Sequence, residues 1–325
     1  MKSLTGITMG DPLGIGPEVS LKAINNEDYI NNIIIFGSSE VIKYYADLLK
    51  VEKEINVIDD VSQFKENTIN VFDNFDFKFS IDEIGTVQGE AGDAAYQYIE
   101  KAIELALNEE IGPIVTAPLN KEALHLGDHK YDGHTEIFAK LTDTKKYTMM
   151  LWSENLSVVH VSTHVSLRKA CDLVKKERVK ECIDLANSAL QNLGISKPKI
   201  AVAGLNPHSG EAGLFGNEDK DEIEPAVKEK AEEWIDVVGP IAPDTVYLKA
   251  YQGHHDIVVS MYHDQGHIPM KLLAFDDGVN VTLGLPIIRT SVDHGTAFDI
   301  AGKGIANETS MFAAVDLAKR FAKNI

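Results

Sequence analysis

The residues best suited to chemistry in this sequence are three histidines, each of which follows a short apolar run. The runs and their histidines are "LSVVHVST" (156–163) with His164, "KIAVAGLN" (199–206) with His208, and "DIVVSM" (256–261) with His263. Runs of β-branched residues of this length are typical of buried strands. Each histidine is therefore expected just beyond the carboxyl end of a strand, where α/β proteins bind their ligands.

Three imidazoles at neighbouring strand ends suggest a metal site. Neutral imidazole is a common ligand for divalent transition metals, and three histidines leave positions open for water or substrate. A nearby carboxylate such as Asp264 could orient His263 from outside the metal shell. Each histidine taken alone is explained as well by a hydrogen bond in a loop or at a helix start. The three together favour the metal.

The elements that would position these histidines are short strands alternating with longer helices. Further strands are expected over 32–37 and 113–118, and amphipathic helices over 89–110, 178–194 and 222–239. Continuous β-branched strands separated by such helices are typical of an α/β protein whose mainly parallel sheet is covered on both faces. The chain contains no repeat of fixed period.

Two stretches could bind an anion at a helix start. "DGHTEIFAKL" (132–141) places His134 and Thr135 at the beginning of a probable helix. Thr135 is a reasonable N-cap, and capping alone would explain it; alternatively, His134 and the helix terminus face an anionic substrate. "GDPLGIGPEVSLKAI" (10–24) opens a helix with Pro17 and Glu18, which are ordinary start signals.

Two cations occur late in the chain and are candidates for binding phosphate or carboxylate. These are Lys271 and, in "LGLPIIRTSVDHG", Arg289. The guanidinium of arginine and the ammonium of lysine both suit such groups. A surface ion pair would explain either residue on its own.

Charge and cysteine content limit the class of partner. The 325 residues carry a formal net charge of −19, which disfavours nucleic acid or an anionic membrane as partner. A small anionic ligand needs only a local positive cluster. Cys171 and Cys182 are spaced unlike a zinc pair, and the first residues lack the apolar core of a signal peptide. We therefore expect a reduced, cytoplasmic protein.

Longer motifs add a family resemblance. "GDPLGIGPE", "DGHTE", "STHVSLR", "LNPHSGE", "MYHDQG" and "GVNVTLGLPIIRTSVDHGTAFDIAGKG" together resemble the 4-hydroxythreonine-4-phosphate dehydrogenase (PdxA) family over residues 6 to about 310. "HGTAFDIAGKGIAN" is also similar to the cofactor loop of isopropylmalate and isocitrate dehydrogenases. The resemblance implies two α/β/α domains, 1–120 with 277–325 and 121–276, an active site in the cleft between them, and a homodimer.

The resemblance also implies roles for individual residues. The implied metal ligands are His164, His208 and His263, for one divalent ion such as Zn, Mg, Co or Mn. The implied substrate contacts are His134, Thr135, Lys271, Asn280 and Arg289, and the implied catalytic residues are Asp264, Asp244 and Lys271. The implied nicotinamide-cofactor residues are His294, Gly295, Asp299 and Asn307. An aspartate in this loop favours NAD over NADP in the similar dehydrogenases.

The implied reaction is oxidation of the C3 hydroxyl of a 4-phosphorylated four-carbon acid, followed by decarboxylation. The segment His267-Ile268-Pro269 and the motifs "VSTHVSLR" and "FDIAGKGIAN" look closer to the branch acting on 4-phospho-D-threonate or 4-phospho-D-erythronate than to the vitamin B6 enzymes. Two alternatives remain open. One is a phosphotransacetylase-like transferase on a related fold, which needs no three-histidine site. The other is a binding protein that keeps the scaffold without the chemistry.

Overall fold

The chain forms two compact units. The computed structural model describes residues 4–25, 27–273 and 278–324. The units comprise Met1–Lys145 with Leu285–Lys323, here the first unit, and Lys146–Gly284 with Asn324–Ile325, the second unit. Residues 121–145, expected in the second domain, contact the first unit, so His134 and Arg289 belong to the same unit. The predicted boundary at 276/277 lies outside the described residues, and residues 278–284, expected in the first domain, fall in the second unit.

The first unit contains six strands that pair in parallel. They are β1 (Thr5–Thr8), β2 (Ile33–Phe36), β3 (Ile55–Ile58), β4 (Ile69–Phe72), β5 (Ile114–Thr116) and β12 (Arg289–Val292). Their order is β3-β4-β2-β1-β5-β12. The strands expected over 32–37 and 113–118 are confirmed as β2 and β5. Five of the six strands are buried at every position, as in parallel sheets covered on both faces.

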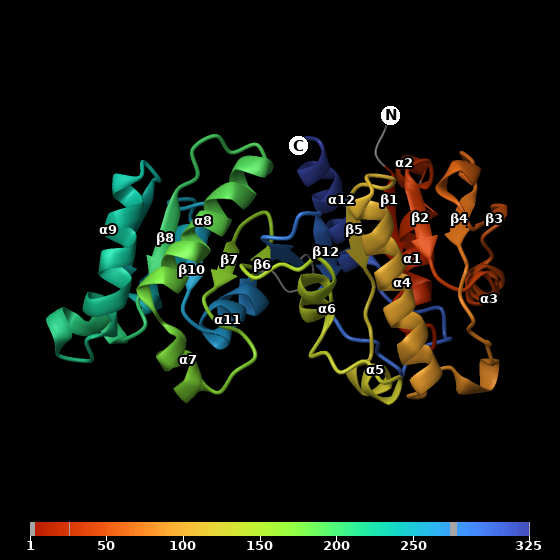
Figure 1. The fold of residues 1–325 in the computed structure, drawn as a ribbon, viewed down its shortest axis with the longest axis horizontal. Helices are drawn as coiled ribbons and strands as arrows, with labels where there is room; N and C mark the ends of the chain where they lie inside the picture. The colour runs from red at the N-terminus through yellow and green to blue at the C-terminus, as the bar shows by residue number, and fades with distance from the viewer. Residues whose placement is uncertain (1–3, 26, 274–277, 325) are drawn as a thin grey trace. The chain divides into compact units, whose positions relative to one another are not determined.

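Helices cover both faces of this parallel sheet (Figure 1). They are α1 (Gly16–Ile24), α2 (Glu27–Ile30), α3 (Ser39–Leu49), α4 (Gly89–Leu107), α5 (Lys121–Leu126), α6 (His134–Leu141) and α12 (Thr309–Ala322), with the short 3₁₀ turns η1 (Val61–Gln63) and η2 (Ile81–Glu83). Helix α4 packs on β1, β2 and β5. Helix α3 packs on β3 and β4, α12 packs on β5 and β12, and α1 contacts both α3 and α12. The helix expected over 89–110 is confirmed.

Gly92 allows α4 and α5 to pack closely, and its replacement gives a stability prediction. A Cβ atom at position 92 would lie 2.0 Å from the carbonyl oxygen of Ala123. Alanine normally stabilises a helix interior relative to glycine by about 0.5–1 kcal/mol. At Gly92 the clash with backbone reverses this sign, and we expect Gly92→Ala to lower the free energy of unfolding by about 2 kcal/mol or more.

Urea unfolding followed by circular dichroism would measure this change. The matched control is Glu104→Ala on the exposed part of the same helix, which removes only an exposed ion pair with Lys101. That control should change the free energy of unfolding by less than about 0.5 kcal/mol. A stabilised Gly92→Ala protein would contradict the close approach of the two helices.

The second unit contains six further strands of mixed direction. They are β6 (Thr148–Trp152), β7 (Ser157–His160), β8 (Ile200–Ala203), β9 (Val237–Ile241), β10 (Ile257–Ser260) and β11 (Val279–Leu283). Strands β7, β10, β8 and β9 lie side by side in parallel, whereas β6 pairs antiparallel with both β7 and β11. The three strands expected before the histidines are confirmed as β7, β8 and β10.

Helices pack on this set of strands as well (Figure 1). They are α7 (Leu167–Leu173), α8 (Lys176–Asn192), α9 (Glu224–Glu232), α10 (Pro243–Tyr251) and α11 (His263–Leu273), with a 3₁₀ segment η3 (Pro207–Gly213) and a π-helical turn η4 (Asp219–Ile223). Helix α8 packs on β6, β7, β8 and β10, α10 packs on β8 and β10, and α11 packs on β7 and β10. A core joins α10 and α11 to the strands through Val246, Met270, Leu151, Val158 and Val258.

For one helix, the predicted C-terminal end is wrong. The helix predicted over 222–239 stops at Glu232, and residues 237–241 form β9 instead. Trp234 adopts a left-handed backbone conformation (φ 69°) that cannot continue the helix. The following "VVGPI" is rich in β-branched residues and pairs with β8. Pairing with a distant strand therefore overrode the helical pattern of the sequence.

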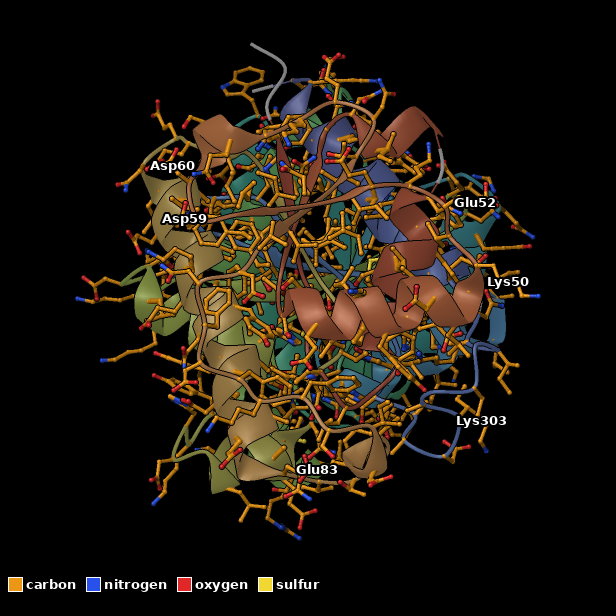
Figure 2. All side chains as sticks on the ribbon, turned by 90° about the vertical axis from the view of Figure 1, so that its right-hand side faces the viewer. Lys50, Glu52, Asp59, Asp60, Glu83 and Lys303 are labelled. Atoms are coloured by element: carbon orange, nitrogen blue, oxygen red, sulfur yellow. The ribbon has the colours of Figure 1, made fainter. Side chains whose placement is uncertain are left out.

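The outer surface of the first unit carries charges of both signs. Figure 2 shows labelled charged side chains at the periphery of this face: Lys50, Glu52, Asp59, Asp60, Glu83 and Lys303. Within the described residues, none of the helices is long and apolar enough to cross a membrane. The exposed charges of this face are the solvated surface expected of an acidic globular chain.

Candidate active site

Arg289 is a buried cation at the start of β12. Only 2% of the residue is exposed, and its Nη2 donates a hydrogen bond of 2.7 Å to Oγ1 of Thr116 on β5. The guanidinium lies 5.6 Å from the ring centre of Phe138. Burial lowers the pKa of Arg289 to about 9, while Glu136 opposes the shift. A guanidinium is well suited to bind an anionic phosphate or carboxylate group, so Arg289 is a candidate anion-binding residue.

His134 lies near this guanidinium, at the first residue of α6. Burial, together with the charges of Arg289 and Lys121, lowers the pKa of His134 well below its usual value. Its Nε2 atom is buried and has no hydrogen-bond partner among the described residues. A neutral imidazole can therefore donate one hydrogen bond here without adding charge. Of the two interpretations of this stretch, Thr135 as the N-cap is wrong, because the cap position is occupied by Gly133, two residues earlier.

The depressed pKa of His134 predicts how stability depends on pH. The folded protein keeps His134 neutral, whereas the unfolded chain binds a proton near pH 6.5. This contribution to stability is present above pH 6.5 and is lost as the pH falls below it, at up to about 1.4 kcal/mol per pH unit. We expect His134→Gln to have a shallower loss of unfolding free energy between pH 6.5 and 5.

The measurement is urea unfolding of both proteins at several pH values, and only their difference is interpreted. The buried carboxyl of Asp11 titrates in the same range, since burial raises its pKa to about 7 despite a hydrogen bond from the Leu13 amide. Titration of Asp11 changes the free energy of unfolding in the opposite direction to that of His134. Because both proteins contain Asp11, its effect cancels in the difference between their unfolding free energies. Parallel pH curves for wild type and His134→Gln would contradict the burial of a neutral His134.

Two of the three expected metal ligands lie side by side in the second unit. His164 follows β7 and is exposed, and His263 is the first residue of α11. Their ring centres are 5.6 Å apart. Nδ1 of His263 lies 2.6 Å from Oδ1 of Asp264, which orients the ring and leaves Nε2 for another partner. The ring of His267 stacks on that of His263 at 3.6 Å between centres.

The third histidine, His208, lies in the strained segment η3. Left-handed φ angles occur at His208 (53°), Ser209 (55°), Glu211 (43°) and Ala212 (55°). Such conformations cost about 1–2 kcal/mol per non-glycine residue and are concentrated at functional sites. The preceding turn is held by Asp219, whose carboxylate accepts hydrogen bonds from the amides of Leu205 and Asn206.

The side chains of His164, His208 and His263 are of a type that binds divalent metals, but their arrangement in the structure does not form a complete site. Imidazole nitrogens beside a carboxylate are a common metal-binding set. In the part of the chain that the structure describes, however, no three such groups gather closely enough to hold an ion. His164 and His263 are brought together, whereas the ring of His208 lies beside that of Phe215. The assignment of all three histidines as metal ligands therefore stays a prediction.

The remaining predicted residues of the second unit lie on three different elements. Asp244 is exposed in the first turn of α10, Lys271 is half-buried in the last turn of α11, and Asn280 lies in β11. The Asn280 amide donates to Sδ of Met149 at 2.9 Å. Of the two acidic candidates, Asp264 contacts a predicted metal ligand. Asp264 is therefore better placed than Asp244 to influence chemistry at the histidines.

The predicted cofactor residues lie together on residues 293–308, here called the cofactor loop, between β12 and α12. This loop contains no helix or strand. Nδ1 of His294 donates to the Gly295 carbonyl at 3.0 Å, and Gly295 faces open space, because a Cβ there would meet no atom within 4 Å. Asp299 is exposed. The Asn307 carboxamide oxygen accepts from the amide and hydroxyl of Thr309 at the start of α12.

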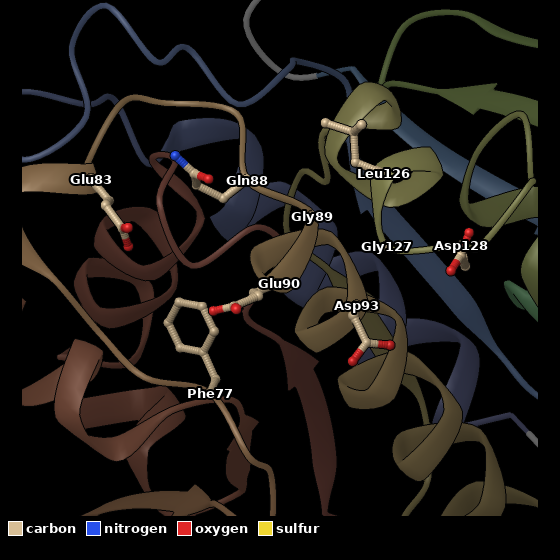
Figure 3. A pocket seen from close by; sticks show the side chains of 9 residues that line it. All are labelled: Phe77, Glu83, Gln88, Gly89, Glu90, Asp93, Leu126, Gly127 and Asp128. Atoms are coloured by element: carbon tan, nitrogen blue, oxygen red, sulfur yellow. The ribbon is translucent and has the colours of Figure 1, made fainter.

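A separate pocket of about 440 Å³ lies where the start of α4 meets the end of α5. Figure 3 shows its lining residues, which are Phe77, Glu83, Gln88, Gly89, Glu90, Asp93, Leu126, Gly127 and Asp128. Four of these nine are acidic. Their negative charge would repel a phosphorylated acid, so this pocket is poorly suited to an anionic substrate.

The fold and these motifs define an α/β enzyme of the dehydrogenase type, and comparisons identify its family. The model of the family described as "Pyridoxal phosphate biosynthetic protein PdxA" matches residues 29–318. The chain belongs to the PdxA family.

Relatives cover almost the whole chain. D-threonate 4-phosphate dehydrogenase from Salmonella typhimurium is 49% identical, over 97% of this chain and 98% of its own. The enzyme of the same name from Pectobacterium atrosepticum is 47% identical, over 99% and 100%. The crystal structure of 4-hydroxythreonine-4-phosphate dehydrogenase from Klebsiella pneumoniae superposes with a TM-score of 0.87, at 44% identity over 98% of this chain and 99% of that one.

Sequence reasoning did not assign two residues to these sites that the structure places there. Thr116 binds the guanidinium of Arg289, and His160 is a fully buried strand residue whose ring lies 4.7 Å from that of His267. Thr116 lies within "PIVTAP" as the last residue of β5, and its position at the carboxyl end of a parallel strand was the available signal. His160 carried no such signal, because it lies inside an apolar run.

Proposed function

We propose that this protein is an NAD-dependent dehydrogenase that oxidises the C3 hydroxyl of a 4-phosphorylated four-carbon hydroxy acid and releases carbon dioxide. D-threonate 4-phosphate is the first candidate substrate, followed by 4-phospho-D-erythronate and 4-phosphohydroxy-L-threonine. The observation that carries the proposal is the buried Arg289 guanidinium beside a neutral His134. It fits an anionic substrate, and relatives named for such a substrate align over nearly the entire chain.

Binding of the substrate is assigned first to the residues of the first unit. The guanidinium of Arg289, fixed by Thr116, would bind the phosphate or carboxylate through two parallel hydrogen bonds. His134 would donate from a neutral ring, and Thr135 would add a hydroxyl. Lys271 and Asn280 would contribute further contacts. Burial makes these contacts stronger than they would be in water, and they fix which carbon reacts.

The chemistry requires a hydride acceptor and a base. A bound nicotinamide dinucleotide supplies the acceptor, and the cofactor loop with His294, Gly295, Asp299 and Asn307 would hold it. As hydride leaves C3, the hydroxyl loses its proton, for which Asp264 is the first candidate and Asp244 the second. The resulting β-keto acid loses its carboxyl group as carbon dioxide and leaves a phosphorylated three-carbon ketone. Lys271 would stabilise the negative charge that develops in this step.

A divalent metal belongs to the proposal as well. His164, His208 and His263 would hold it, with Asp264 orienting His263 through Nδ1. Such an ion would polarise the oxygen at C3. Metal dependence would also exclude the alternative, a phosphotransacetylase-like transferase, which needs no three-histidine site.

We further propose a homodimer. Helix α11 exposes 57% of Ile268 and 78% of Leu272, one turn apart on the same face. Exposed apolar residues at this spacing fit an interface with a second copy better than a solvated surface. Sedimentation velocity of the wild type and of Leu272→Glu would test this.

A reducing cytoplasm fits the free thiols of Cys171 and Cys182.

The decisive assay follows NADH and NADPH formation with the three candidate substrates, with and without chelator. Chelator-sensitive turnover of D-threonate 4-phosphate or 4-phospho-D-erythronate with NAD supports the proposal. Preference for the amino substrate would move the protein to vitamin B6 synthesis. No turnover of any of the three in the presence of metal would refute the proposed activity.

A further inference from the structure

The cofactor loop is fixed by side chains from two helices, although it has no regular structure of its own. The amide of Ala306 donates to Oε1 of Glu18 at 2.7 Å, and Nζ of Lys22 donates to the Ala306 carbonyl at 2.6 Å. Both side chains come from α1. The amide of Gly302 donates to the hydroxyl of Tyr45 on α3 at 3.1 Å. These contacts hold the chain directly before Asn307.

Glu18 and Lys22 form a pair that binds both polar atoms of one residue of the loop. Their charged groups lie 2.9 Å apart, one helical turn along α1. The Glu18 side chain is fully buried, and that of Lys22 is 20% exposed. Lys22 also lies 3.4 Å from the Gly304 carbonyl and 3.9 Å from the Glu308 carboxylate. An ion pair this well buried is costly to maintain unless each charge gains further hydrogen bonds, and the backbone of the loop provides them.

Two observations indicate that the pair does more than stabilise α1. The second carboxylate oxygen of Glu18, Oε2, is buried without a hydrogen-bond partner among the described residues, which is a cost that a purely stabilising residue would not carry. The loop itself needs external support, because Gly302 (φ 75°) and Gly304 (φ 70°) are left-handed and Ile305 is 65% exposed. Figure 2 shows Lys303 at the outer edge of the unit, so this stretch lies at the surface.

We infer that Glu18 and Lys22 are positioning residues for the nicotinamide cofactor: by clamping Ala306 they place Asn307 and the preceding loop for cofactor binding. This inference rests on the proposed function, which assigns the cofactor to this loop. Neither side chain needs to touch the cofactor. Two charged hydrogen bonds converge on Ala306, so loss of either charge frees the loop. The cofactor must then order the loop as it binds, and this ordering lowers its affinity.

The test compares Glu18→Gln and Lys22→Met with the wild type. Glu18→Gln keeps the shape of the side chain and removes its charge, and Lys22→Met keeps most of the apolar stem of a partly exposed residue. Lys22→Arg retains a cation and serves as the rescue variant. Lys43→Met, on the exposed face of α3, is the matched control for loss of a lysine. Circular dichroism would verify that each variant is folded.

Two measurements are made on each protein: the dissociation constant for NAD by calorimetry, and hydrogen exchange of residues 300–307 by mass spectrometry. We expect both charge-removing variants to bind NAD about tenfold more weakly and to exchange faster in this loop. The rescue and control variants should stay near the wild type. The affinity for inorganic phosphate, assigned to Arg289, should not change.

Each outcome bears on a different claim. Faster exchange with unchanged NAD affinity would show that the pair only stabilises the loop, and unchanged exchange would show that it does not fix the loop; either result overturns the inference alone. If the wild type binds neither NAD nor NADP, the proposed function fails together with the cofactor part of the inference. If Glu18→Gln does not fold, the partly exposed Lys22→Met decides the result.

Discussion

Replacing Arg289 with methionine is expected to lower kcat/KM for the phosphorylated substrate by about a hundredfold or more. The guanidinium is buried, bonded to Thr116 and close to a neutral His134, and methionine removes both its charge and its hydrogen-bond donors. Arg289→Lys should recover only part of the activity, since an ammonium cannot reproduce the two parallel hydrogen bonds of the planar group.

The measurement must separate substrate binding from folding, because removing a buried arginine can also destabilise the protein. We would therefore compare kcat/KM for D-threonate 4-phosphate with that for D-threonate, and express the result as their ratio. A general loss of folded enzyme lowers both values and leaves the ratio unchanged. Loss of an anion-binding residue lowers the ratio. An unchanged ratio in Arg289→Met would refute the assignment of phosphate to Arg289, and Lys43→Met is again the control.

Replacing His208 with alanine is expected to reduce turnover by about a hundredfold or more and to weaken metal binding in parallel. The ring of His208 lies beside that of Phe215, whereas His164 and His263 lie side by side, so this experiment tests whether His208 joins them as a ligand. The strained backbone at residues 208–212 is the structural reason to expect a role. The metal content of the purified variant, measured by mass spectrometry, accompanies the activity assay.

His254→Ala is the matched control, because His254 is an exposed histidine on a loop of the same unit. It should retain both activity and metal. Wild-type activity in His208→Ala would refute its assignment as a metal ligand. Normal metal content with low activity would assign His208 to the substrate instead. Asp264→Asn should weaken metal binding by about 10- to 100-fold, because it removes the carboxylate that orients His263.

The sequence alone determined the fold class, the strands that lead to the three histidines, and the family. These features are local or collective: β-branched runs such as Ile257–Ser260 favour strands wherever they occur, and long motifs identify a family without any knowledge of contacts. The start of α1 was also readable, because Pro17 and Glu18 are local helix signals. The family predicted from these motifs is confirmed by the match over residues 29–318.

Only the tertiary structure decided how residues far apart in the chain meet. Glu18 reads in the sequence as a residue of the first helical turn, yet its carboxylate binds the amide of Ala306 at the other end of the chain. The sequence left Arg289 open between an anion-binding residue and one half of a surface ion pair, and the structure buries it against Thr116. The helix expected to reach residue 239 stops at Glu232 because β8 offers a pairing partner. In each case the deciding energy comes from burial and hydrogen bonding between distant segments, which no local pattern of residues encodes.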